Sequence, residues 1–373
     1  MTTTINNEHN KLNVPNLRFP EFQGEWEKCK LGDLCNVLMC KRILASQTNT
    51  EEGVPFYKIG TIGNTPDAYI SQELFDEYKA KYNYPHKGEV MITCAGTVGK
   101  CVIYDGKDAY YQDSNIVWID NPSQYITNEF LYHLLYKVDW RKLNSTTIIR
   151  IYNDDLRNLK LNYPQIEEQQ KISRLLSLLD KRIAIQSKVI GKLQSLIKGI
   201  AQKIVHSNKT NVRLSECVEC SSSTLQESDI CEHGAYPVYG ANGIVGYLDN
   251  YNTEGEAVYI IKDGSSVGTV SYVTGKCSAT GTLNTLQAKE GYSLQYLYYL
   301  LKVFNFEPYK TGMAIPHIYF KDYGKAKFFC PSYTEQLRYA RLLSAIDNKL
   351  SAEQHILTSL SLQKQYLLRQ MFI

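Results

Sequence analysis

The sequence predicts an α+β protein with an internal pseudo-two-fold repeat: two globular domains joined by two long helices that form an antiparallel coiled coil. The first observation is a repeated segment, because Arg174-Leu175-Leu176-Ser177 recurs as Arg341-Leu342-Leu343-Ser344 at an offset of 167 residues. The second is that each copy follows a proline, Pro164 or Pro331, at the same offset. The third is that each copy opens a stretch with heptad-like spacing of apolar residues. This layout favours a spacer carrying two units over a single catalytic pocket.

The composition is that of a globular protein large enough for two domains. The chain has 373 residues, 43% hydrophobic and 21% charged, and a net charge of +3. This charge permits nucleic-acid binding without indicating it. The ten cysteines show no spacing pattern of a disulfide framework. No run of about 18 apolar residues occurs. We therefore expect a reduced, cytoplasmic protein without a membrane span.

The domain order follows from these patterns. Short strands are expected at residues 88–93 and 116–119, and matching short helices at 128–138 and 294–303. The offset falls from 183 between Leu31 and Leu214 to 167 at the long helices, so the second domain has shorter, divergent loops. The expected segments are a flexible tail (1–16), a first globular domain (17–163), a first long helix (164–208), a second globular domain (209–330) and a second long helix (331–373).

The long helices carry two matched apolar seams whose steps alternate four and three residues, as in a coiled coil. The first seam comprises Leu176, Leu179, Ile183, Gln186, Ile190, Leu193 and Ile197, and the second comprises Leu343, Ile346, Leu350, Glu353, Leu357 and Leu360. A polar residue breaks both seams at the same level, which fixes register and partner. The economical arrangement packs the seams on each other as a spacer of roughly 57 Å. The alternative is that each helix packs back on its own domain.

Basic and hydroxyl-bearing residues in the expected loops are candidates for DNA contacts, because such groups suit phosphates and base edges. Any one of them could equally be a solvated loop residue, so the argument lies in the set. The candidates in the first domain are Lys41, Arg42, Thr97, Lys100, Thr146, Thr147 and Arg150, and those in the second are Ser222, Thr224, Tyr239, Asn242, Ser265, Lys310 and Thr311.

The sequence patterns that could indicate a catalytic site or a metal site are weak. Asp67, Glu77 and Lys79 fit the carboxylate and lysine pattern of a magnesium-dependent nuclease. However, residues 71–81 also read as a charged, solvent-facing helix, and the second domain has no counterpart. Four potential zinc ligands have poor spacing: Cys217, Cys220, Cys231 and His233. No phosphate-binding loop occurs. A nuclease and a purely protein-binding coiled-coil adaptor stay open as alternatives.

Several motifs together resemble the specificity subunit of type I restriction–modification systems, over nearly the whole chain. They are Leu17-Arg18-Phe19-Pro20-Glu21-Phe22 with Gly24-Glu25-Trp26, Lys30-Leu31-Gly32-Asp33-Leu34, the run Tyr236-Pro237-Val238-Tyr239-Gly240-Ala241-Asn242-Gly243, and two Pro-x-x-x-Glu-Gln helix starts at Pro164 and Pro331.

The resemblance implies two target-recognition domains, each reading one half of a bipartite double-stranded DNA site, with the helices setting the gap. It implies a non-catalytic chain without a metal, which binds two methyltransferase subunits and restriction subunits that translocate and cut DNA. S-adenosylmethionine, ATP and magnesium would belong to those partners. The whole system would methylate DNA and defend against foreign DNA. The resemblance does not supply individual DNA-contact residues.

Overall fold

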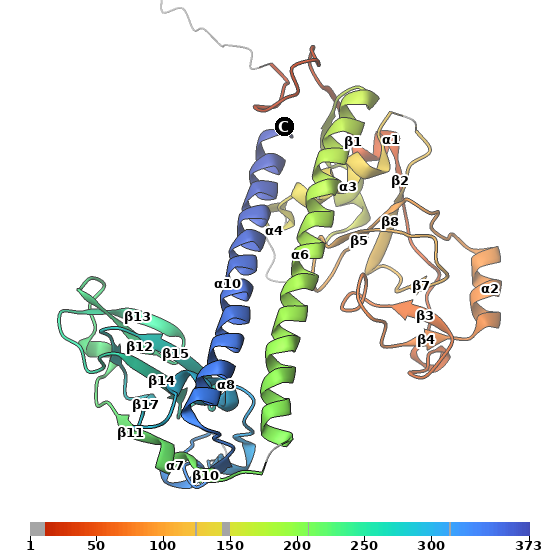
Figure 1. Cartoon of the computed structure of the whole chain (residues 1–373). Coiled ribbons are helices and arrows are strands. Elements are labelled where there is room, and N and C mark those ends of the chain that lie inside the picture. The colour runs from red at the N-terminus through yellow and green to blue at the C-terminus, as the bar shows by residue number, and fades with distance from the viewer. Residues whose placement is uncertain (1–11, 124, 144–149, 208, 313–314) are drawn as a thin grey trace, which may run out of the picture. The chain divides into compact units, whose positions relative to one another are not determined.

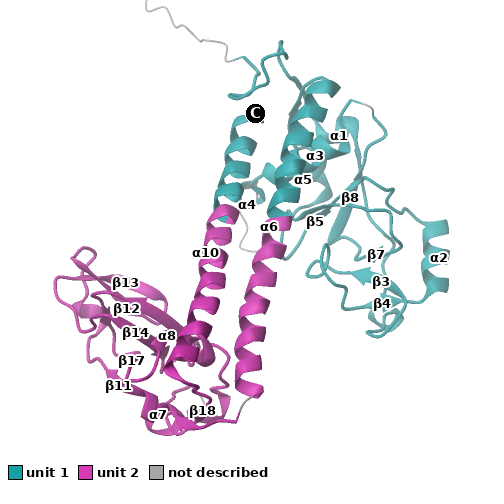
Figure 2. Cartoon of the chain, viewed as in Figure 1, with its two compact units in different colours: residues 1–184, 358–373 teal, residues 185–357 magenta. Residues whose placement is uncertain are grey.

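The protein is described by a computed structural model that covers residues 12–123, 125–143, 150–207, 209–312 and 315–373. It divides into unit 1, residues 1–184 and 358–373, and unit 2, residues 185–357 (Figure 2). The long helices α6 (Ile166–His206) and α10 (Tyr333–Gln370), labelled in Figure 1, each contribute to both units (Figure 2). The expected boundaries of the five segments stay predictions.

Unit 1 is built on two small sheets and a ribbon. The four-stranded sheet has the order β2 (Asn36–Leu38), β8 (Ile116–Asp120), β5 (Val90–Thr93) and β6 (Cys101–Ile103). The three-stranded sheet has the order β4 (Tyr69–Ile70), β3 (Val54–Tyr57) and β7 (Tyr110–Tyr111), with β3 and β7 parallel. The ribbon pairs β1 (Glu27–Lys30) with β9 (Lys160–Tyr163). The strands expected at 88–93 and 116–119 are thus confirmed.

The central strand β5 is buried on both faces, which explains its unbroken apolar sequence. Because side chains alternate along a strand, Val90 and Ile92 face a core that includes helix α3 (Asn128–Lys137) and α6. Met91 faces a second core with Trp118. The sheet therefore connects the long helix to the outer part of the unit.

Caps define the helices of unit 1. The hydroxyl of Thr127 accepts a hydrogen bond from the Phe130 amide (3.2 Å) and starts α3, confirming the expected helix. Ser71 caps α2 (Gln72–Lys81) through the Leu74 amide in the same way. The shorter helical segments are η1 (Ala45–Gln47), α1 (Leu31–Leu34), α4 (Trp140–Leu143) and α5 (Asn153–Arg157).

Unit 2 repeats this topology strand for strand. Its four-stranded sheet has the order β11 (Val218–Ser222), β17 (Leu283–Ala288), β14 (Glu256–Ile261) and β15 (Val270–Thr274). Its three-stranded sheet has the order β13 (Gly243–Leu248), β12 (Tyr236–Gly240) and β16 (Ser278–Ala279), with β12 and β16 parallel. Its ribbon pairs β10 (Val212–Arg213) with β18 (Lys327–Phe328). The helical segments are α7 (Leu214–Cys217), η2 (Glu227–Asp229), α8 (Leu294–Leu301), η3 (Glu307–Tyr309) and α9 (Phe320–Tyr323).

The long helices run antiparallel, as expected. In unit 1, Leu176 near the start of α6 shares a core with Leu368 near the end of α10. In unit 2, Ile197 near the end of α6 shares a core with Leu343 and Leu350 near the start of α10. The alternative in which each helix packs only on its own domain is therefore wrong.

The segment before β1 is fastened to the helices of unit 1. The amide of Leu17 donates to the carbonyl oxygen of Gln370 (2.9 Å). The guanidinium of Arg18 donates two hydrogen bonds to the buried Glu168 carboxylate, at 2.8 and 2.7 Å. This pairing holds the start of α6 against the chain entering the domain.

Candidate nucleic-acid interface

A loop after the central strand of each unit forms the same hydrogen-bonded hairpin. In unit 1 the Thr93 amide donates to Lys100 O (3.0 Å), and the Gly99 amide donates to Thr93 O (2.8 Å). In unit 2 the Ile261 amide donates to Thr269 O (3.0 Å), and the Gly268 amide donates to Ile261 O (2.9 Å). The backbone hydrogen bonds that hold the loops at 94–100 and 262–269 are thus the same in both units.

Glycine is required at one position of each hairpin. Gly99 has φ +82° and lies against the Trp140 ring, whereas Gly268 has φ +90° and lies against Phe306. A side chain at Gly99 would collide with the Trp140 ring, one at Gly268 would be crowded by Phe306, and either would strain the backbone. The exposed residues Thr97 and Ser265, both candidates, are presented by these fixed hairpins.

In unit 1, two candidate arginines meet at one strained turn. The Arg42 guanidinium pairs with Asp113 (Nε to Oδ2, 2.8 Å), and Arg150 Nη2 donates to Ser114 O (3.3 Å). Ser114 has φ +52°, which makes it the non-glycine residue with positive φ in the part of the chain that the structure describes. The Asn115 carbonyl accepts from the Cys94 amide (2.7 Å), so the turn abuts the hairpin loop. Sequence reasoning missed Asp113 and Ser114.

Unit 2 has the same backbone frame with different side chains. The Ile151 amide donates to Cys94 O (2.8 Å), and the Ile318 amide donates to Lys262 O (2.9 Å). The position before each isoleucine is therefore equivalent, Arg150 in unit 1 and His317 in unit 2. Likewise, the Lys262 amide donates to Thr282 O (3.0 Å), as the Cys94 amide does to Asn115 O. By this alignment the strained Ser114 corresponds to Gly281.

His317 is part of a compact cluster that sequence reasoning also missed. Its Nδ1 lies 2.6 Å from Asp263 Oδ1, and both side chains are about one-third exposed (36% and 37%). Its backbone exchanges hydrogen bonds with the candidate Thr311, at 2.9 and 2.7 Å. The signal that could have found His317 is its offset of 167 residues from Arg150.

Other candidates have local partners or lie outside this cluster. The Lys100 ammonium donates to Ile62 O (2.5 Å), Lys310 pairs with Glu307 (2.5 Å), and Lys41 Nζ lies 5.3 Å from the centre of the Tyr82 ring. Thr224 and Asn242 are exposed in connecting segments. Thr146 and Thr147 lie outside the described residues.

The expectation of loops at Tyr239 and Ser222 is wrong. Tyr239 lies in β12, where strand pairing with β13 and β16 overrides the glycine-rich sequence, and its ring is 5.7 Å from that of Tyr259. Ser222 ends β11, and its hydroxyl donates to Asn284 Oδ1 (2.8 Å). Both residues therefore belong to the sheets.

The polar residues of the two seams contact each other within unit 2. Gln186 Nε2 donates to the Glu353 carbonyl (3.0 Å) and to its carboxylate, which also pairs with Lys349 (2.5 Å). Lys349, followed by Gln186, holds the pKa of Glu353 below its usual range. Because residues 186 and 353 are themselves related by the repeat offset, the pair lies on the pseudo-two-fold axis of the coiled coil. None of the thirteen expected seam residues is exposed.

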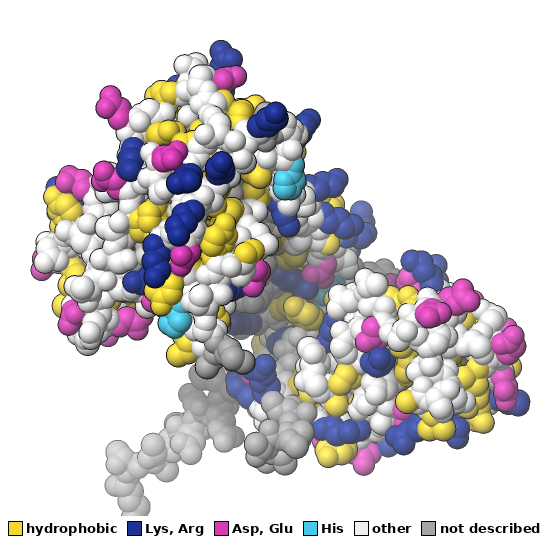
Figure 3. Space-filling view, turned by 90° about the horizontal axis from the view of Figure 1, so that it is seen from below, with side chains coloured by type: hydrophobic (Ala, Val, Ile, Leu, Met, Phe, Trp, Pro, Cys, Tyr) yellow, Lys and Arg dark blue, Asp and Glu magenta, His cyan; other side chains and the backbone are white. Residues whose placement is uncertain are grey.

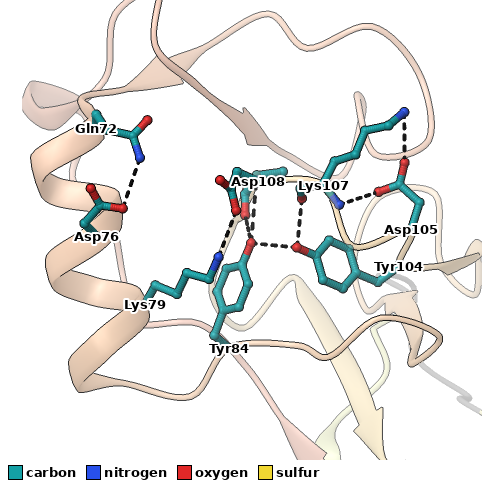
Figure 4. A network of polar contacts seen from close by, with 9 residues as sticks. Gln72, Asp76, Lys79, Tyr84, Tyr104, Asp105, Lys107 and Asp108 are labelled. Atoms are coloured by element: carbon teal, nitrogen blue, oxygen red, sulfur yellow. Dashed lines mark hydrogen bonds and ion pairs between the residues drawn. The ribbon is translucent and has the colours of Figure 1, made fainter.

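The residues of the possible nuclease site each pair with a different partner. Asp67 pairs with Lys58 (3.0 Å), Glu77 with Lys81 (2.8 Å), and Lys79 with Asp108 (2.8 Å). Figure 4 shows Lys79 extending from α2 toward Asp108, beside the hydrogen-bonded Tyr84 and Tyr104 hydroxyls (2.9 Å). This network fastens α2 to the segment before β7.

The possible zinc ligands are likewise not assembled into a site. Cys217 is buried with its Sγ 3.9 Å from Cys330 Sγ, whereas Cys231 is exposed. Among the described residues, no group of three or more histidine, cysteine or acidic side chains could hold a metal ion. The same part of the chain contains no helix with the length and apolar character to cross a membrane.

On the face seen in Figure 3, Lys and Arg side chains lie among acidic and hydrophobic side chains.

Comparisons with known proteins agree with this arrangement. Residues 23–195 and 206–362 both match the family described as the type I restriction modification DNA specificity domain. A putative type I restriction enzyme specificity subunit of Haemophilus influenzae is 51% identical over 152 residues, 41% of this chain and 39% of that protein. A putative type I specificity subunit of Mycoplasma genitalium is 26% identical over 255 residues, 61% of this chain and 65% of that protein. The chain thus spans less than two thirds of the length of each of these relatives.

The crystal structure of a type I restriction–modification system S subunit from M. genitalium has the same fold, with a TM-score of 0.69 and 19% identity over 96% of this chain and 99% of that one. A chain from a structure on complex assembly and conformational transition of the type I R-M system gives a TM-score of 0.51 and 17% identity, over 93% and 97% of the two chains. With two matched segments that cover most of its length, the chain belongs to the type I restriction modification DNA specificity family.

Proposed function

We propose that this chain is the sequence-reading subunit of a type I restriction–modification complex, in which each unit recognises one half of a bipartite DNA site. The observation that carries the proposal is the repeated frame with different side chains at equivalent positions. Arg150 in unit 1 corresponds to His317 in unit 2, and the half-buried Lys262 of unit 2 takes the place of the buried Cys94. One scaffold that presents two sets of polar groups suits two different half-sequences.

The chain would supply specificity, while its partners supply the chemistry. Two methyltransferase subunits and the restriction subunits would bind S-adenosylmethionine, ATP and magnesium. Exposed apolar side chains on the long helices favour protein docking there. They are Leu178, Leu362 and Tyr366 in unit 1, and Ile185, Leu196 and Ile356 in unit 2. Such a complex would work on DNA in the cytoplasm, where the ten free thiols of the chain would stay reduced.

The test is a binding comparison with the purified complex of this chain and its methyltransferase subunits. Methylation profiling of DNA from cells carrying the system would first identify the two half-sites. We expect that duplex to bind at least about a thousand-fold more tightly than one with both halves scrambled. Equal affinity for the two duplexes would contradict sequence reading, and protection by the methyltransferase alone would favour a protein adaptor.

A further inference from the structure

Each unit has a ribbon in which two basic residues lie directly opposite each other. Lys30 faces Lys160 across β1 and β9, and Arg213 faces Lys327 across β10 and β18. All four side chains are exposed, and among the described residues none of them forms an ion pair. Lys30 Nζ instead donates to the neutral amide oxygen of Asn158 (3.1 Å).

This arrangement is unfavourable for the isolated fold. Directly opposed side chains of an antiparallel pair have Cβ atoms about 5 Å apart, so like charges there repel. The nearby carboxylates are engaged by backbone amides, because Asp33 accepts from the Lys30 amide (2.7 Å) and Glu216 from the Arg213 amide (3.1 Å). Both carboxylates keep their negative charge, but among the described residues neither forms an ion pair with the opposed basic side chains.

The basic charge is retained in both ribbons, whereas the charge two residues earlier in the chain is not. Lys28 lies two residues before Lys30, and the matching position of unit 2 is Asn211. Lys30 itself is matched by Arg213, so the charge persists although the chemical group changes. A position that accepts either group requires positive charge rather than a particular hydrogen-bond geometry.

We propose that each opposed basic pair binds a phosphate of the DNA backbone, outside the base-reading cluster of its unit. This inference rests on the proposed function. A phosphate contact accepts lysine or arginine and carries no sequence information. An acidic protein partner common to both ribbons would need matched apolar surroundings as well. Asn162, beside Leu161 in unit 1, is matched in unit 2 by Phe329. The surroundings of the two basic pairs therefore differ in apolar character.

The salt dependence of binding tests the proposal in the complex of the full chain with its methyltransferase subunits. Affinity would be measured by fluorescence anisotropy across a potassium chloride series, with the bipartite duplex and the scrambled duplex. Each phosphate contact contributes about 0.9 to the slope of log affinity against log salt. We expect the double variants Lys30→Gln with Lys160→Gln and Arg213→Gln with Lys327→Gln, which remove both cations of a pair, each to reduce the slope by about 0.9. Each should weaken both duplexes by the same factor.

Lys28→Gln is the matched control, because it removes one exposed charge from the same strand at a position that is neutral in unit 2. It should leave the slope within about 0.3 of the unaltered complex, as should the conservative Lys160→Arg. Unchanged unfolding temperatures would confirm that the variants fold.

Three results would overturn the proposal. One is an unchanged slope for the two double variants in a complex that still selects the bipartite duplex. Another is an equal loss of slope in Lys28→Gln. The third is weakened assembly with the methyltransferase in the absence of DNA, which would assign the pairs to a protein partner. Loss of selectivity in the unaltered complex would instead refute the proposed function.

Discussion

Arg150 and His317 occupy equivalent positions in the two repeats and differ in chemistry. Arg150 presents a permanently charged, planar donor beside the strained Ser114 turn. His317 donates from Nδ1 to the Asp263 carboxylate, which leaves Nε2 of the neutral ring as a hydrogen-bond acceptor. This difference makes the two positions the strongest residue-level candidates for distinguishing the half-sites.

Substituting either residue should change the recognition of one half-site only. We expect Arg150→Gln to weaken recognition of only the first half-site, and His317→Arg to alter the preferred base at one position of the second. A good bidentate contact discriminates by about 1–3 kcal/mol, or roughly ten- to hundred-fold. Binding to a library of duplexes randomised in one half at a time would measure this.

Each variant serves as the control for the other, since the half-site read by the unaltered unit should keep its preference. Equal losses at both halves with either variant would contradict independent reading. An unchanged preference for His317→Arg at every position would remove His317 from the interface.

Some of the candidate residues could be predicted from the sequence, and the reason others could not is physical. Arg42 and Arg150 were identified separately as basic loop residues. Their meeting at Ser114 depends on the pairing of strands distant in sequence, which no local pattern reports. The sequence predicts a loop at Tyr239 because of the nearby glycines, whereas sheet pairing makes this residue part of a strand.

At the scale of elements, α3 packs on α6 in unit 1 as α8 packs on α10 in unit 2, and the two contacts differ at one buried position. His133 on α3 is buried, with Nε2 3.4 Å from the Ser177 hydroxyl, and the residue at the repeat offset is the buried Leu300. Nearby, the largely buried Lys364 pairs with Asp180 (2.5 Å) and lies 4.1 Å from the Tyr136 ring centre. The heptad pattern predicted both seams but could not reveal these polar groups beside one of them.

The buried histidine should make the stability of the protein depend on pH. Burial lowers the pKa of His133 from 6.5 to about 4, with a further decrease from Lys364 opposed by Asp180. The unfolded chain therefore binds this proton first, and stability falls as pH decreases from about 6.5 to about 4. The loss is on the order of 3 kcal/mol at about pH 4, since each pKa unit corresponds to about 1.4 kcal/mol.

Chemical unfolding of the full chain across this pH range would measure the effect. His133→Leu, which copies unit 2, should flatten the pH dependence by that amount. His355→Gln, at an exposed histidine on α10, should follow the unaltered protein. Parallel curves for His133→Leu and the unaltered protein would contradict the assignment.

At the scale of the whole molecule, the matched seams support the proposed role of the helices as a spacer between the half-sites. Inserting one heptad after Ser187 in α6 and one after Gln354 in α10 preserves both seams, because these positions are related by the repeat offset. Seven residues lengthen a helix by about 10.5 Å, which corresponds to about three base pairs of DNA at 3.4 Å each.

We therefore expect the preferred gap to increase by about three base pairs, while each half-sequence stays the same. Methylation profiling of cells carrying the altered chain would measure the gap. The matched control inserts the heptad in α6 alone, which should misalign the seams and lower the unfolding temperature. An unchanged gap in the double insertion would argue against the spacer role.

The Gln186 and Glu353 pair on the pseudo-two-fold axis has a consequence for how the two halves of the chain recognise each other. If a half-chain paired with a second copy of itself, this level of the coiled coil would place identical residues face to face. Two glutamines can exchange hydrogen bonds, whereas two glutamates at neutral pH repel each other. The unlike pair thus favours joining the first half to the second over joining the second half to itself. If the gene arose by duplication, its two halves began as identical sequences. One such substitution would then have favoured pairing between the two halves of a single chain.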